Sequence, residues 1–112
     1  MKKIAKSFKH AFHGLYDAFL GEHNFRVMAL LVAGSFLFGF FYIEHAWEVA
    51  ALIISGAFML FVEMINTAIE KSLDLWTTQK HDKIRFVKDV MSGAALVASL
   101  AWLFIIVLIF FY

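Results

Sequence analysis

The hydrophobic and polar positions divide the chain into one amphipathic segment followed by three long apolar runs. Residues 1–20 separate on a helical wheel into an apolar half and a half that carries lysines, histidines and other polar residues. This separation predicts an amphipathic helix in the interfacial plane of a membrane, although a soluble helix packed on a core gives a similar pattern. The apolar runs predict membrane-spanning helices at residues 27–43, 49–70 and 90–112.

Composition supports the same fold class, an all-α membrane protein with an interfacial helix and three transmembrane helices. The 112 residues are 62% hydrophobic and 17% charged, and the mean hydropathy of +0.78 is too high for an ordinary soluble domain. The length predicts a single domain over residues 1–112. The chain has no cysteine, which excludes disulfides and thiolate metal sites.

The positions of the basic residues predict the orientation in the membrane. All ten lysines and arginines lie before the first predicted span or between the second and the third. Basic residues collect on the cytoplasmic side of membrane proteins. We therefore expect a multi-pass membrane protein with a cytoplasmic N-terminus. Candidate aromatic anchors are Tyr42, Trp47 and Tyr112, whereas Trp102 lies deeper than expected for an anchor.

The second apolar run continues without Gly or Pro into the polar stretch EMINTAIEKSLD, residues 63–74. At 3.6 residues per turn, four polar side chains fall in one sector about 80° wide: Glu63, Asn66, Glu70 and Asp74. A carboxylate at the bilayer centre costs roughly 3 kcal/mol on insertion scales, so intramembrane polar clusters indicate function. A solvated helix end explains Asp74 nearly as well, but not Glu63 with Asn66.

Other charged residues are predicted at the same membrane level. Glu22 precedes the first span, and Lys88 and Asp89 precede the third. Carboxylate and amide oxygens suit Mg²⁺, and a neighbouring lysine suits phosphate. Magnesium, phosphate and a spare carboxylate as base are the parts that phosphoryl transfer requires. The sequence has no Walker motif, and the glycines of GSFLFG, residues 34–39, are expected to serve helix packing.

The stretches VEMINTAIEKSLDL and KHDKIRFVKDVMSGAALV resemble the small integral-membrane lipid kinases of bacteria, the family of diacylglycerol kinase and undecaprenol kinase. The resemblance covers nearly the whole chain. The matched positions are Gly14, Leu15, Glu22, Phe25, Arg26, Glu63, Asn66, Thr67, Ala68, Ile69, Glu70, Asp74, Lys88, Asp89, Ser92, Gly93 and Ala94.

The resemblance implies Mg²⁺- and ATP-dependent phosphorylation of a membrane lipid hydroxyl at the cytoplasmic face of the bacterial inner (cytoplasmic) membrane. It implies Glu63 as catalytic base with Asn66 in support, and Glu22 and Glu70 as metal ligands. For the nucleotide, the resemblance implies contacts from Lys3, Glu22, Glu70, Gln79, His81, Lys88 and Asp89. For the lipid, it implies contacts from Phe12, Phe25, Glu63 and Ser92. Asp74 is implied in a supporting position. At Lys3 the surrounding sequence departs from the family pattern.

The resemblance also implies a homotrimer with composite active sites, and it implies no nucleic-acid partner. Three spans from a short chain enclose little space, so neighbouring chains are expected to complete the site. Diacylglycerol and undecaprenol both stay open as the substrate, with a slight preference for undecaprenol. The main alternative is an ion- or proton-coupled transporter or channel subunit, but no charged residue is predicted in the outer half of any span. A structural membrane oligomer leaves the carboxylates unexplained.

Overall fold

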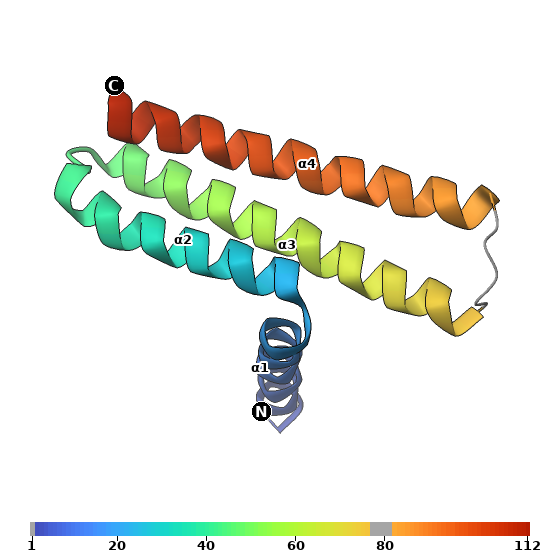
Figure 1. The fold of residues 1–112 in the computed structure, drawn as a ribbon. Helices are drawn as coiled ribbons and strands as arrows, with labels where there is room; N and C mark the ends of the chain where they lie inside the picture. The colour runs from blue at the N-terminus through green and yellow to red at the C-terminus, as the bar shows by residue number, and fades with distance from the viewer. Residues whose placement is uncertain (1, 77–81) are drawn as a thin grey trace.

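The computed structural model describes residues 2–76 and 82–112, and this part of the chain is helical apart from short junctions. The helices are α1 (Lys2–Gly21), α2 (His23–Tyr42), α3 (Ala46–Trp76) and α4 (Asp82–Phe111). Helices α2, α3 and α4 pack side by side, and α1 runs away from them at a steep angle from the start of α2 (Figure 1). Helices α2, α3 and α4 are each long and apolar enough to cross a membrane. The prediction of an all-α protein with three such helices is confirmed.

Helix α3 is longer than a membrane crossing requires. Its 31 residues extend about 46 Å at 1.5 Å per residue, against a hydrocarbon core of about 30 Å. The absence of proline from the chain leaves the backbone free to continue from apolar into polar sequence. The polar stretch therefore extends the same helix, with exposed Trp47 near its start and exposed Trp76 at its end.

The core of the bundle lies where α2, α3 and α4 meet. Its central cluster consists of buried residues from all three helices: Val32, Met59, Val62, Ala98 and Trp102. Trp102 is only 9% exposed, so it packs in the core. This agrees with its position inside the third predicted span, which is deeper than expected for an interfacial anchor. Among the described side chains, its Nε1 is the buried polar atom that lacks a hydrogen-bond partner.

Close packing of α2 against α3 depends on glycine. A Cβ atom on Gly56 would lie 2.9 Å from Cγ1 of Val32 on α2. One on Gly39 would lie 3.4 Å from Cδ2 of Leu52 on α3, and 3.0 Å from Cδ1 of Ile43 at the end of its own helix. A Cβ on Gly34 would meet nothing within 4 Å. The packing role expected of residues 34–39 therefore holds for Gly39 and not for Gly34, while Gly56 makes the closest of these approaches.

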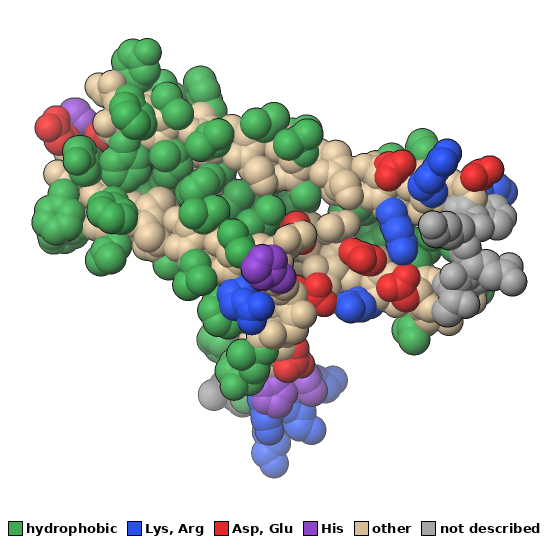
Figure 2. Space-filling model, viewed as in Figure 1, with side chains coloured by type: hydrophobic (Ala, Val, Ile, Leu, Met, Phe, Trp, Pro, Cys, Tyr) green, Lys and Arg blue, Asp and Glu red, His purple; other side chains and the backbone are tan. Residues whose placement is uncertain are grey.

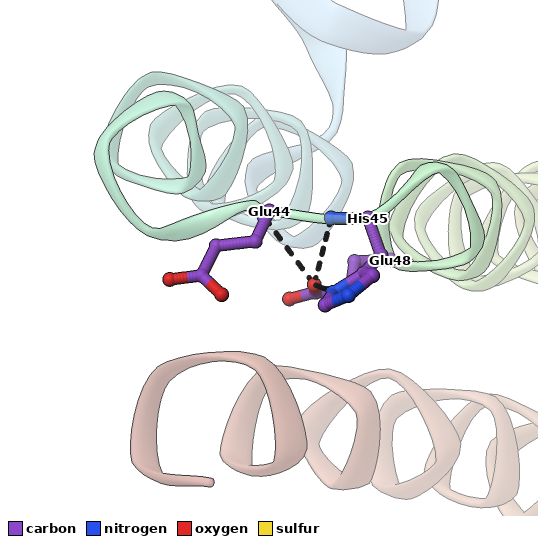
Figure 3. Close-up of polar contacts among 3 residues, drawn as sticks. All are labelled: Glu44, His45 and Glu48. Atoms are coloured by element: carbon purple, nitrogen blue, oxygen red, sulfur yellow. Dashed lines mark hydrogen bonds and ion pairs between the residues drawn. The ribbon is translucent and has the colours of Figure 1, made fainter.

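The turn between α2 and α3 is organised by Glu48 (Figure 3). Its Oε1 accepts hydrogen bonds from the backbone N–H groups of Glu44, at 3.3 Å, and His45, at 3.1 Å. The same oxygen lies 3.1 Å from Nδ1 of His45. A glutamate in the first helical turn that reaches back in this way caps the helix start. Glu48 is only 8% exposed, so a turn that the sequence shows only as polar contains a buried carboxylate.

Candidate active site

The polar side chains of α3 change from buried to exposed along the helix. Glu63 is 5% exposed, Asn66 is half-buried, and Glu70 and Asp74 are exposed. The order follows the prediction that the stripe runs from membrane depth toward the helix end. A solvated position for Asp74 agrees with the structure, and Glu63 is the carboxylate of this stripe that the bundle encloses.

Glu63 interacts with polar groups of α3 and of the junction between α1 and α2. The side chain of Asn66, almost one turn later on α3, hydrogen-bonds with the Glu63 carboxyl group, and the charges of Glu70 and Glu22 act on it electrostatically. Glu22 has an extended backbone, with φ −115° and ψ 112°, between α1 and α2. This break in the helix brings a carboxylate from outside the bundle to the stripe on α3.

Two lysines neutralise part of this negative charge. Nζ of Lys71 lies 3.4 Å from Oε1 of Glu22, and Nζ of Lys88 lies 3.2 Å from Oδ1 of Asp74. The first pair joins α3 to the α1–α2 junction, and the second joins α3 to α4. Charged side chains gather over this end of the bundle and over α1, while most of the remaining visible surface is hydrophobic (Figure 2).

Two grooves meet α3 on either side of Glu63 along the helix. The polar groove, of about 320 Å³, lies between α1, the junction and α3, and is lined by Gly14, Asp17, Ala18, Glu22, Met64, Thr67, Ala68 and Lys71. The apolar groove, of about 620 Å³, is lined by Phe12, His13, Leu15, Tyr16, Phe19, Phe25, Ala29 and Leu60. Leu60 precedes Glu63 by about one turn, so the apolar groove reaches α3 next to the enclosed carboxylate.

The structure brings some of the predicted site residues together and leaves others apart. Phe12 and Phe25 share the apolar groove, whereas Asp89 and Ser92 are exposed on α4. Lys3 precedes Glu22 by 19 residues, about 28 Å along α1 at 1.5 Å per residue. The remaining two predicted nucleotide contacts, Gln79 and His81, lie outside the described residues.

The carboxylates of one chain form no closed metal cage in the structure. Within residues 2–76 and 82–112, no group of three or more Asp, Glu or His side chains is close enough to hold a metal ion. Magnesium is usually bound through one or two carboxylates together with waters and substrate phosphates. Glu22 and Glu70 therefore have the right chemistry for a metal that arrives with a nucleotide.

The contact between Lys71 and Glu22 was not predicted from the sequence. Lys71 entered the sequence argument only as one of the ten basic residues that indicate orientation. The two residues lie 49 positions apart, and the pairing depends on how the α1–α2 junction lies against α3. The sequence does show that Lys71 directly follows Glu70 of the polar stripe. It does not show that Glu22 is the partner of this lysine.

Comparison with known proteins identifies the family. The family model described as prokaryotic diacylglycerol kinase matches residues 9–110. The chain is 34% identical to undecaprenol kinase of Bacillus subtilis over 98% of its length and 89% of that relative. It is 28% identical to a diacylglycerol kinase of Helicobacter pylori strain J99 over 93% of its length and 81% of the relative. A diacylglycerol kinase of Synechocystis is 32% identical over 85% of the chain and 55% of the relative. The chain is an integral membrane lipid kinase and belongs to the prokaryotic diacylglycerol kinase family.

Proposed function

We propose that this lipid kinase transfers the γ-phosphoryl group of ATP, with Mg²⁺, to the hydroxyl of a membrane lipid at the cytoplasmic face. The observation that carries the proposal is the enclosed carboxylate of Glu63. The charges of Glu22 and Glu70 act on it electrostatically, and an apolar groove reaches α3 at Leu60, about one turn away. These observations support a base, residues able to hold a metal and a surface for a lipid chain in the same part of the molecule.

Glu63 is proposed as the general base. Its carboxylate accepts the proton of the lipid hydroxyl as the hydroxyl oxygen attacks the γ-phosphorus, and the bond from the γ-phosphorus to the bridging oxygen breaks, so that ADP leaves. Asn66 orients the carboxylate through the hydrogen bond between the two side chains. Bound Mg²⁺ supplies positive charge against the phosphate oxygens. Glu22 and Glu70 are the residues that would hold it.

The nucleotide is proposed to bind on the exposed polar side of the stripe. Lys88 and Asp89 lie on α4 at this end of the bundle, and Lys88 reaches across to Asp74 of α3. Asp74 thereby supports the lysine. Lys3 lies too far along α1 to join Glu22 of its own chain. A homotrimer with composite sites, in which a neighbouring chain supplies Lys3, accommodates this distance, and Gln79 and His81 are proposed nucleotide contacts of the same site.

The lipid is proposed to enter along the apolar groove, with its chain against Phe12 and Phe25 and its headgroup toward Glu63 and Ser92. Helix α1 exposes large apolar side chains and carries four lysines, which suits an interfacial position on the cytoplasmic face of the inner membrane. We propose undecaprenol as the first alcohol to test and diacylglycerol as the second. The preference rests on the undecaprenol kinase relative, which the chain matches over 98% of its length.

Glu63→Gln tests the proposal. The amide keeps the size of the side chain but accepts no proton, so turnover should fall by about 10²- to 10⁴-fold. Purified protein in lipid vesicles would be supplied with labelled ATP, Mg²⁺ and undecaprenol or diacylglycerol, and phosphorylated lipid would be measured. Glu44→Gln is the matched control, because Glu44 is an exposed glutamate at the opposite end of the bundle. Near-normal turnover of Glu63→Gln would disprove the assignment of the base.

A further inference from the structure

Lys71 is a charged side chain of the polar groove to which the proposed reaction assigns no role. It follows Glu70 on α3, and its ammonium lies 3.4 Å from Oε1 of Glu22. The Lys71 side chain is 67% exposed and the Glu22 side chain is 31% exposed. The pair therefore lies at the mouth of the groove, where water and a dissolved cation have access to it.

Glu22 requires positive charge whether or not a metal is present. Its negative charge acts electrostatically on the enclosed carboxyl group of Glu63, as does the charge of Glu70. Like charges that are close together destabilise a site unless a cation offsets them. Lys71 supplies that cation from α3, and in doing so it ties the extended junction between α1 and α2 to the bundle.

We propose that Lys71 is the resting partner of Glu22 and competes with the metal for its carboxylate. This inference rests on the proposed role of Glu22 as a metal ligand. Lys71 holds Glu22 against α3 in the metal-free protein and gives up the carboxylate when the metal and nucleotide bind. It acts through Glu22 and is therefore a positioning residue, which sets the metal concentration at which the site fills.

The size of the effect follows from the exposure of the pair. A solvent-exposed ion pair contributes little, because water screens the attraction and both side chains lose freedom. Removing the competing ammonium should therefore tighten metal binding by about two- to fivefold. Lys71→Arg keeps a cation that can reach Glu22, so its metal affinity should stay close to that of the unmodified protein.

Mn²⁺ is the probe for the first measurement. Full-length protein in lipid vesicles would be titrated with Mn²⁺ in the presence of a non-hydrolysable ATP analogue, and free Mn²⁺ would be measured by electron paramagnetic resonance. Lys71→Gln should bind Mn²⁺ more tightly, and the increase should vanish when Glu22→Gln is also present. Arg85→Gln is the matched control, because it removes one positive charge from an exposed position on α4.

Hydrogen exchange without metal or nucleotide gives a second readout, independent of turnover. Lys71→Gln should speed exchange of the backbone amides around Glu22, and saturating Mn²⁺ with the analogue should remove the difference. Equal tightening by Arg85→Gln, or tightening by Lys71→Gln that persists with Glu22→Gln, would overturn the proposal. Unchanged Mn²⁺ binding by Glu22→Gln alone would instead show that Glu22 is no metal ligand. That result would disprove the role given to Glu22 under the proposed function, and the role of Lys71 would fail with it.

Discussion

Replacing Gly56 by alanine tests how closely α2 and α3 must pack. The new Cβ would lie 2.9 Å and 3.4 Å from the two γ-methyl groups of Val32 and 3.8 Å from Cδ1 of Trp102. Val32 is buried, and its β-branched side chain has one strongly preferred rotamer in a helix. Either the valine leaves that rotamer or the helices separate. Overpacking of this kind costs about 1–3 kcal/mol, which the higher helix propensity of alanine offsets by about 1 kcal/mol.

Gly34→Ala is the control that separates steric crowding from helix propensity. It gains the same helix propensity as Gly56→Ala, but its Cβ would meet nothing within 4 Å. Unfolding in mixed micelles with increasing SDS would give the free energy of unfolding of both variants. We expect Gly34→Ala to be about 1–3 kcal/mol more stable than Gly56→Ala, and Val32→Ala to relieve the crowding when combined with Gly56→Ala. Equal stability of the two single variants would refute the reasoning. A loss of turnover in Gly56→Ala is also expected, because α2 begins just after Glu22 and α3 carries Glu63.

Two further predictions concern ion pairs and caps. Glu48→Ala should lower the free energy of unfolding by about 0.5–2 kcal/mol, because it removes the acceptor of the N–H groups of Glu44 and His45. Glu48→Gln keeps a carbonyl oxygen and should lose less, so equal losses in SDS unfolding would argue against the cap. Asp74→Asn should change stability by no more than about 1 kcal/mol, because its pair with Lys88 is solvent-exposed. A thermal-unfolding loss of more than about 2 kcal/mol would show that this pair stabilises the packing of α3 on α4.

The helices were predictable from the sequence because their signals are local. Runs of apolar residues predicted three helices able to cross a membrane, and the absence of Gly and Pro between Val62 and Asp74 predicted that one of them would continue past its apolar part. The burial of Glu63 in the bundle agrees with its position directly after the second apolar run. Hydrophobicity and helical periodicity depend only on neighbours along the chain, so the sequence contains them directly.

Contacts between helices were less predictable because they depend on crossing geometry. The sequence drew attention to Gly34 and Gly39, but the closest approach is at Gly56, where Val32 happens to face it. Likewise, no local pattern pairs Lys71 with Glu22. The turn at residues 44–48 was predicted to be polar, but not to enclose a carboxylate, because burial there depends on the hydrogen bonds that Glu48 makes with the turn.

The three tryptophans supply markers of depth within the chain itself. Trp47 and Trp76 are exposed near opposite ends of α3, and their 29-residue separation corresponds to about 43 Å along the helix. Trp102 is buried between them in the core. In variants that keep a single tryptophan, the fluorescence would come from one position along the bundle. Acrylamide in the water and brominated lipids in the bilayer would therefore quench the three variants to different extents. An impermeant quencher added outside sealed vesicles would then distinguish the two ends of α3 and give the orientation of the chain without an attached label.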